Sequence, residues 1–277
     1  MTFIKYCLPV FISLFVLQAP VALAETISIG GSTTVEKYIQ LAAKAYTAIH
    51  PDITFSINGG GSTAGFAESL DQRVHIGMMS REMAPQEVAK SGDIKHIAIA
   101  LDAVVPVVSK EIYASGIHHI KPGTLAQIYQ GQITNWNILG GPNRHIIVVD
   151  KNIYHGTREV FAHYVLGETD APKVSVSVIL DSDVDVLRLI HSSDQAIGYV
   201  GIGYVDQDVH MLGLQIKGRT VSATHENIRS GSYPMSRKLY LLLPRKIPGY
   251  VQGFVDFILS VTGQAIVKQA GFLPIRE

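Results

Sequence analysis

The chain alternates short apolar runs with stretches of helical periodicity, which is the pattern of an α/β protein. Residues with high β propensity gather at 26–29, 53–57 and 74–79, and a turn rich in Gly, Ser or Thr follows the first two runs. Apolar positions over 35–46 have helical spacing, and a second helix is predicted over 64–70. This order of strand, turn and helix predicts a parallel or mixed sheet covered by helices.

The same order returns in the second half of the chain. A strand is predicted at 146–149, a turn at 154–157, a helix over 158–166 and a buried strand at 196–200. No fixed-period repeat accompanies this similarity. The pattern therefore predicts a chain made of two α/β halves.

Two long β runs are predicted to connect these halves, one at 97–108 and the other near 233–237 and the following 238–243. A first lobe assembled from both ends of the chain then has two hinge strands leading to a second lobe. We expect lobe 1 to contain residues 25–104 and 227–277, and lobe 2 to contain residues 105–226. Small ligands bind between domains and at the carboxyl ends of parallel strands, so a cleft between the lobes is expected to hold the ligand.

The first 24 residues have the composition of a secretory signal peptide. Lys5 is their only charge, an apolar run follows it, and the segment ends in Ala22-Leu23-Ala24, which is an A-x-A cleavage site. We expect cleavage after Ala24 and a periplasmic location, with an uncleaved anchor as the alternative. The only cysteine, Cys7, lies within this segment, so no disulfide is expected after export.

The overall composition serves only to exclude some classes of protein and partner. The 277 residues are 47% hydrophobic and 17% charged, which is typical of a folded globular protein. The formal net charge is zero, so nothing favours nucleic acid as a partner. If the protein binds an anion, a local site must attract it.

Three turns have the composition of anion-binding sites: 31–35, 60–65 and 155–158. Each is rich in glycine or hydroxyl side chains and lies between a predicted strand and a predicted helix. Such a turn offers unpaired backbone N–H groups at a helix N-terminus, where the helix dipole favours negative charge. One such turn is usually an ordinary helix cap. Three of them, on two predicted lobes, favour a shared anion site.

Other motifs are weaker or missing from the sequence. Residues 59–64 fit G-x-G-x-x-A, a dinucleotide fingerprint, but a lone match is weak, and an exported chain meets little dinucleotide. The sequence contains no G-x-S-x-G elbow, no H-E-x-x-H and no cysteine pair. We therefore expect no catalysis, no metal and no cofactor.

Several segments, taken in order, make the chain resemble the phosphate-binding proteins of the high-affinity phosphate ABC importer. The resemblance covers essentially the whole chain after the leader. It implies a type II periplasmic-binding-protein fold whose two α/β lobes close on one phosphate. The matching segments are 31–35, 59–65, 76–82, 128–136, 197–204 and 233–240.

The resemblance also implies which residues bind the ligand. Hydroxyl and backbone N–H groups of the three turns would hold the anion, with the residues that close the third strand and a cation in lobe 2. The candidate ligand-binding residues are Thr33, Thr34, Val35, Ser62, Ser80, Arg81, Lys151, His155, Gly156 and Thr157.

Three of these positions depart from the family pattern. Lys151 stands where many members have arginine, and lysine lacks the bidentate fork of arginine. His155 replaces a serine and adds a titratable group, which we expect to act as a conditional donor. Arg81 stands where some relatives have an aspartate that accepts the proton of phosphate. Without that acceptor, a ligand with no proton, such as sulfate, is not excluded.

We expect a solute-binding protein that captures inorganic phosphate and delivers it to a membrane ABC permease, acting as a monomer. Two alternatives remain open at this stage. The same fold could carry or sense another oxyanion such as sulfate. A periplasmic phosphatase is a third reading, but it needs a nucleophile with a base or a two-metal cluster, and the sequence shows neither.

Overall fold

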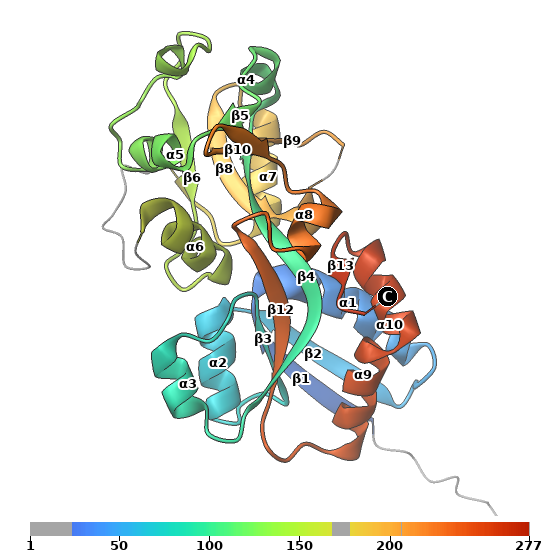
Figure 1. The fold of residues 1–277 in the computed structure, drawn as a ribbon. Helices are drawn as coiled ribbons and strands as arrows, with labels where there is room; N and C mark the ends of the chain where they lie inside the picture. Colours follow the sequence, from blue (N-terminus) through green and yellow to red (C-terminus); the bar gives the residue numbers. More distant parts are fainter. Residues whose placement is uncertain (1–23, 168–177, 206, 277) are drawn as a thin grey trace, which may run out of the picture.

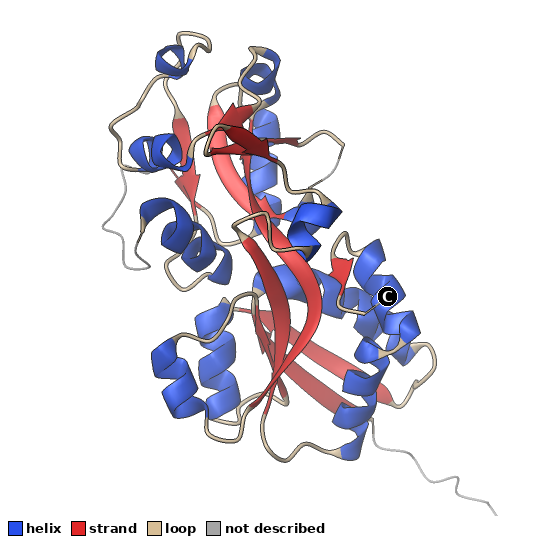
Figure 2. Ribbon diagram, viewed as in Figure 1, coloured by secondary structure: helices blue, strands red, loops and turns tan. Residues whose placement is uncertain are grey.

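The computed structural model describes residues 24–167, 178–205 and 207–276, and it has two lobes joined by long strands (Figure 1). The predicted signal peptide lies outside the described residues, except for Ala24. Both lobes mix helices and strands, and helices cover the strands in each (Figure 2). The fold is the predicted arrangement of two α/β lobes joined by two strands.

The first lobe is built from both ends of the chain. Its parallel strands lie in the order β2-β1-β3, and β12 pairs antiparallel with β3. Its elements are β1 (Glu25–Gly31), α1 (Thr33–Thr47), β2 (Ile53–Gly59), α2 (Ser62–Leu70), β3 (Ile76–Met79), α3 (Pro85–Ser91), β12 (Ser236–Leu243), α9 (Gly249–Leu259), α10 (Val261–Gln269) and β13 (Leu273–Pro274).

The second lobe contains the middle of the chain. Strand β8 pairs with β6, which in turn pairs with β7, while β11, β10 and β5 form a separate small sheet. Its elements are α4 (Lys110–Ala114), β5 (His119–Ile120), α5 (Pro122–Tyr129), the 3-10 helix η1 (Trp136–Leu139), β6 (Ile147–Asp150), α6 (Gly156–Phe161), the π-helix η2 (Ala162–Leu166), β7 (Val178–Ile179), α7 (Asp183–Ser192), β8 (Ala196–Gly201), the 3-10 helix η3 (Ile202–Tyr204), β9 (His210–Met211), β10 (Gly213–Ile216), β11 (Arg219–Val221) and α8 (His225–Arg229).

The predicted hinge strands are present as β4 (Lys95–Val108) and β12. Strand β4 pairs with β12 through Ala103 and with β8 from Val104 onward, so one strand belongs to both lobes. Figure 1 shows β4 and β12 side by side between the lobes. The run of apolar residues in β4 follows from this position, because the strand is covered in both lobes.

Each lobe has its own apolar core. In lobe 1, α1 and α9 pack on β1 and β12, and Val35, Tyr38, Leu239 and Phe254 are fully buried there. In lobe 2, Trp136 is fully buried, as expected for a packing anchor, and its Nε1 donates to the Gln195 carbonyl at 2.8 Å. The core of lobe 2 also includes Ile228, Tyr233 and Met235. These residues precede β12, so the return to lobe 1 is completed at that strand.

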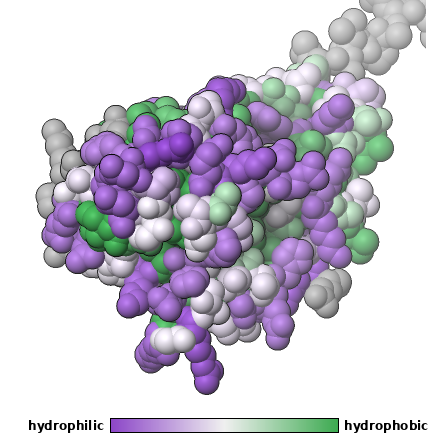
Figure 3. Space-filling view, turned by 90° about the horizontal axis from the view of Figure 1, so that it is seen from above, coloured by the Kyte–Doolittle hydropathy of each residue, from purple (hydrophilic) through white to green (hydrophobic). Residues whose placement is uncertain are grey.

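The face of the molecule seen in Figure 3 is mostly hydrophilic. Seen from above in Figure 3, hydrophobic residues form only small groups among hydrophilic ones. Over residues 24–167, 178–205 and 207–276, no single helix is long and apolar enough to span a membrane. Helices α9 and α10 reach that length and composition only together, across a bend of 64°.

Candidate functional site

The first predicted turn lies in lobe 1, at the carboxyl end of β1. Gly31 adopts a φ of +126°, and a side chain there would lie 2.7 Å from the Gly65 Cα, so glycine is required. Thr33 and Thr34 begin α1, where the first N–H groups have no acceptor within the helix. The Thr34 side chain is fully buried, and its hydroxyl points toward lobe 2.

The second turn brings two serine hydroxyls together. Ser62 is the first residue of α2, and Ser80 follows β3 directly. Both side chains are fully buried. The Ser80 N–H donates to Ser62 Oγ at 3.0 Å, and the two Oγ atoms are 3.3 Å apart. Since Ser62 Oγ already accepts from a backbone N–H, its own proton can be directed to a ligand.

The third turn, from lobe 2, packs directly on these residues. Gly156 lies against Ser62 and Ser80 so closely that a Cβ would overlap the Ser62 hydroxyl and come within 2.6 Å of Ser80 Oγ. Thr157 Oγ1 is 3.0 Å from Thr34 Oγ1 across the lobes. The three turns that the sequence singled out therefore meet at one place, and they do so in a closed arrangement of the lobes.

The crossing strands supply an arginine to the same place. Arg237 of β12 is 7% exposed, and its Nη1 donates to Thr157 Oγ1 at 3.1 Å and to Ser80 Oγ at 3.5 Å. Its Nε donates to Asp102 Oδ2 at 2.8 Å. One guanidinium thus contacts a hydroxyl from each lobe.

Lys151 approaches the site from the end of β6. Its backbone N–H donates to Asp150 Oδ1 at 2.8 Å, and its side chain has no exposed surface. Among the described residues, Nζ has no hydrogen-bond acceptor, and it lies 3.5 Å from Asp183 Oδ1. Burial lowers the pKa of Lys151 below its ordinary value, although the Asp183 carboxylate opposes that shift.

His155 precedes α6 and contacts lobe 1 through its ring. Its Nε2 is 2.7 Å from Thr33 Oγ1 and 2.9 Å from the Asp181 carbonyl oxygen. A carbonyl only accepts, so the Nε2 proton is fixed there and a neutral ring leaves Nδ1 as an acceptor. Burial, reinforced by Lys151, lowers the pKa of His155 to about 4. The ring is therefore neutral near pH 7, and donation by Nδ1 would require protonation of the ring, so the expected role as a conditional donor stays a prediction.

Arg81 is engaged by two carboxylates. Its guanidinium donates to Glu87 Oε1 at 2.9 Å and forms an ion pair with Glu159 of lobe 2, and Nη2 also contacts Thr63 Oγ1 at 3.3 Å. Among the described residues, Arg81 thus links the two lobes at the edge of the pair formed by Ser62 and Ser80. The arginine that contacts the hydroxyl groups of Ser80 and Thr157 is Arg237.

Two buried residues of the site were not among the sequence candidates, namely Asp183 and Arg237. Asp183 begins α7, where an aspartate ordinarily caps the helix, so its position carried no special signal. Arg237 interrupts an apolar strand, and Asp102 interrupts the other crossing strand. Opposite charges in two predicted neighbouring strands are a signal that could have found this pair.

The remaining candidate, Val35, contributes only backbone here. Its side chain is fully buried in the core of lobe 1, and its N–H belongs to the first turn of α1. Within the parts of the chain that the structure describes, no group of three or more His, Cys, Asp or Glu could hold a metal ion.

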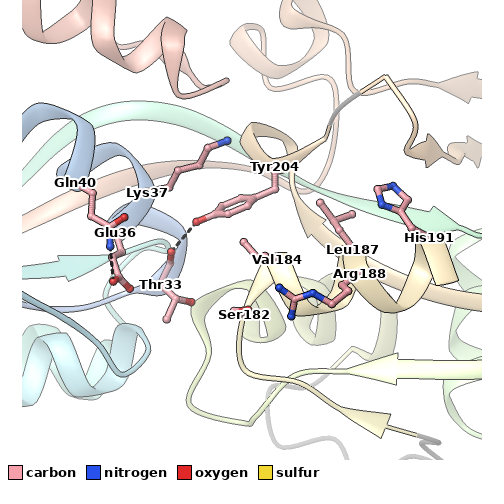
Figure 4. A pocket seen from close by; sticks show the side chains of 10 residues that line it. All are labelled: Thr33, Glu36, Lys37, Gln40, Ser182, Val184, Leu187, Arg188, His191 and Tyr204. Carbon is pink, nitrogen blue, oxygen red and sulfur yellow. Dashed lines mark hydrogen bonds between the residues drawn. The ribbon is translucent and has the colours of Figure 1, made fainter.

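A second interlobe feature is a groove of about 680 Å³ between α1 and α7. Figure 4 shows Tyr204 reaching across it to α1, where its hydroxyl donates to the Thr33 carbonyl at 2.8 Å. Lys37 Nζ donates to the Gly203 carbonyl at 2.5 Å and lies 4.8 Å from the centre of the Tyr204 ring. These contacts hold the first turn of α1 against lobe 2.

Comparison with known proteins agrees with the fold. The model of the PBP superfamily domain matches residues 18–262. A crystal structure from Clostridium perfringens, described as a phosphate ABC transporter substrate-binding protein with bound phosphate, is 31% identical. The match covers 91% of this chain and 100% of that one, with a TM-score of 0.82.

Two further relatives also have names that refer to phosphate transport or phosphate binding. An ABC-type phosphate transport receptor from Vibrio cholerae is 27% identical, and the match covers 89% of this chain and 99% of that one, with a TM-score of 0.71. Phosphate-binding protein PstS of Borreliella burgdorferi is 28% identical over 257 residues, which is 90% of each chain. The chain therefore belongs to the PBP superfamily and, within it, to the family of the phosphate-binding proteins of ABC importers.

Proposed function

We propose that this protein captures inorganic phosphate between its two lobes and delivers it to an ABC permease. The proposal rests on the convergence of three donor-rich turns at one buried place and on the names of the relatives. The chain covers nine-tenths of the Borreliella burgdorferi protein and all of the Clostridium perfringens one, so the likeness extends to both lobes.

The single observation that carries the proposal is the Lys151 ammonium group. A fully buried ammonium that has no hydrogen-bond acceptor among the described residues is costly, because its lost hydration is replaced only by an ion pair. Asp183 at 3.5 Å offsets part of this cost. A tetrahedral anion beside Nζ would supply the missing acceptors and favour the charged form of Lys151.

Hydroxyl groups from both lobes would complete the binding site. Thr34, Ser62 and Ser80 from lobe 1 and Thr157 from lobe 2 are fully buried, and hydroxyl protons rotate to meet an acceptor. The backbone N–H groups of Val35 and Gly156 would add donors at helix N-termini. Hydrogen bonds to a charged acceptor contribute roughly 1.5–3 kcal/mol each, so five or more support micromolar or tighter binding.

The closed lobes explain how the ligand would be retained. Gly156 packs on Ser62 and Ser80, so an anion can reach these hydroxyls only when the lobes part along β4 and β12. Thr33, His155 and Arg81 would then act at the edges of the site, where each holds the two lobes together. Hinge closure of this kind is a common way to enclose a ligand.

We propose further that the protein is exported by its leader, is cleaved after Ala24 and acts in the periplasm as a monomer without catalysis. Transfer of phosphate to the permease requires only binding and release. The division into lobe 1 (25–104 and 227–277) and lobe 2 (105–226) is part of the same proposal, except that residues 227–235 go with lobe 2, whose core contains Ile228, Tyr233 and Met235.

The test is equilibrium titration of the ligand-stripped protein with inorganic phosphate, in parallel with a Lys151→Met variant. One-to-one binding at micromolar or tighter affinity, lost or strongly weakened in the variant, would support the proposal. Absence of binding by the native protein would contradict it, and full affinity in the variant would remove Lys151 from the site.

A further inference from the structure

One carboxylate holds the third anion-binding turn at both of its ends. Asp150, the last residue of β6, is 5% exposed. Its Oδ1 accepts the Lys151 N–H at 2.8 Å, and its Oδ2 accepts the Arg158 Nε–H at 3.2 Å. Lys151 begins the segment 151–157, and Arg158 follows that segment in α6. The segment that supplies the lobe 2 donors of the candidate site is therefore closed into a loop by the two oxygens of one side chain.

Tyr199 supplies a third donor to the same carboxylate. It lies on β8, and its hydroxyl donates to Asp150 Oδ1. Burial, reinforced by the charge of Asp150, raises the pKa of Tyr199, so this hydroxyl keeps its proton. The Tyr199 ring also stacks on Phe161 of α6, with ring centres 4.0 Å apart and an angle of 6° between the planes. Asp150 thus joins the end of β6, the first turn of α6 and β8 through buried hydrogen bonds.

These contacts hold the frame of the turn. The three donors to the Asp150 carboxylate are a backbone N–H, a guanidinium and a phenol, and none of the three is among the proposed ligand donors. The ammonium group of Lys151 is paired with Asp183 instead. Asp150 therefore fixes where the segment 151–157 lies, while other atoms of that segment face the candidate site.

The fit between the lobes makes the position of this turn critical. Gly156 packs so closely on lobe 1 that a Cβ there would lie 2.2 Å from Ser62 Oγ. Thr157 Oγ1 lies 3.0 Å from Thr34 Oγ1 across the lobes. A binding site needs its groups held to within about 0.5 Å by side chains that are themselves locked in place. A larger displacement of the turn would misplace the donors that lobe 2 contributes.

Resting on the proposed function, we propose that Asp150 is a positioning residue for the anion site and that Arg158 and Tyr199 act through it. The three side chains hold the segment 151–157 in its binding shape before the ligand arrives. A site ordered in advance avoids the loss of conformational freedom that a mobile turn would suffer on binding. The affinity for phosphate then depends on a carboxylate that contributes no contact to the ligand.

The experiment is calorimetric titration of native protein and variants with inorganic phosphate at pH 7.5. Asp150→Asn replaces one acceptor oxygen by an amide donor, and Tyr199→Phe removes one donor while keeping the stacked ring. We expect phosphate binding to weaken by about tenfold or more in both variants, the loss typical when a group that orients a ligand-binding residue is removed.

Tyr129→Phe is the matched control. Tyr129 is fully buried in the core of the same lobe, and its ring centre also lies close to that of Phe161, at 4.7 Å. Its hydroxyl donates to the Val149 carbonyl at 2.9 Å and not to Asp150. This variant should bind phosphate as the native protein does.

A double-mutant cycle separates positioning from general support of the fold. In a Thr157→Val background the loss caused by Tyr199→Phe should shrink, because one of the positioned donors is already gone. In a Ser62→Ala background the loss should remain in full, because Ser62 belongs to lobe 1 and not to the segment held by Asp150.

Three results would overturn the inference. These are native affinity in either Asp150→Asn or Tyr199→Phe, an equal loss in Tyr129→Phe, or equal losses in the Thr157→Val and Ser62→Ala backgrounds. If Asp150→Asn does not fold, Tyr199→Phe and its cycle carry the test alone. Failure of the native protein to bind phosphate would instead refute the proposed function itself.

Discussion

Asp102 and Arg237 stand directly opposite each other on the two strands that join the lobes. They are register partners in the β4–β12 pair, and Arg237 Nη2 lies 2.6 Å from Asp102 Oδ2, with side chains 3% and 0% exposed. The same guanidinium contacts Ser80 and Thr157. The hinge strands therefore also hold the Arg237 guanidinium of the candidate site. A change in the geometry of the hinge would for this reason also change the contacts that Arg237 makes in the site.

Replacing Asp102 with Asn should destabilise the protein strongly. The change leaves the Arg237 guanidinium buried without its counter-charge, and loss of one partner from a buried pair costs about 3–5 kcal/mol. Urea unfolding monitored by circular dichroism measures the free energy. Asp93→Asn is the matched control, because it breaks the exposed Arg245–Asp93 pair and should cost at most about 1 kcal/mol. Similar losses in both variants would contradict this account.

Ser62→Ala should weaken phosphate binding by roughly 1.5–3 kcal/mol, since it removes one donor to a charged acceptor. The measurement is calorimetric titration. Ser69→Ala is the control, because Ser69 is buried in the same helix but donates to the Gly65 carbonyl within lobe 1. Unchanged affinity in Ser62→Ala would mean that this hydroxyl only joins α2 to β3.

Glu159→Gln should speed the release of phosphate. Glu159 in lobe 2 pairs with Arg81 in lobe 1, so the variant weakens a contact made when the lobes are closed. We expect dissociation about tenfold faster with association little changed, because most affinity differences within one interface lie in dissociation. Stopped-flow fluorescence measures both rates.

Glu87→Gln is the matched control for that experiment. Glu87 binds the same guanidinium but lies in the same lobe as Arg81. Its replacement should not accelerate release. Equal acceleration in both variants would show that the Arg81 contacts support lobe 1 alone and have no part in closure.

His155 should make stability fall on acidification. Its pKa is about 4 in the folded protein, against 6.5 ordinarily, so below about pH 6.5 the unfolded chain takes up a proton that the folded chain refuses. Stability is therefore lost as the pH falls from about 6.5 to 4, by up to about 3 kcal/mol. Thermal unfolding across this range should show a smaller decline in His155→Gln. The exposed His119→Gln should behave as the native protein, and identical profiles in all three would rule out this role for His155.

The elements of the fold could be predicted because each has a local signal. The strand runs at 26–29 and 53–57 appear as β1 and β2, and the long apolar run at 97–108 appears as β4. An apolar run of that length in a chain with α/β alternation has few other places to lie. The predicted helix at 158–166 was correct in its position, but its second half, Ala162–Leu166, is a π-helix, which periodicity alone does not reveal.

The site was only partly predictable, for a physical reason. Turns can be recognised in a sequence by their glycine and hydroxyl residues. Ser62, Gly156 and Thr157 were predicted in this way, and the structure brings them together. Asp183 and Asp185 look alike in the sequence, and only the tertiary packing of α7 buries Asp183, beside Lys151 and Thr34, and leaves Asp185 exposed. The role of a charge depends on its burial, which is a property of the tertiary structure.

The most direct test of the central claim is a crystal structure of the protein grown with phosphate. The account predicts one phosphate enclosed by both lobes, within hydrogen-bond distance of Ser62 Oγ, Thr157 Oγ1 and Lys151 Nζ. A phosphate bound at a different place, or lobes that close identically with these three atoms contacting no anion, would contradict it.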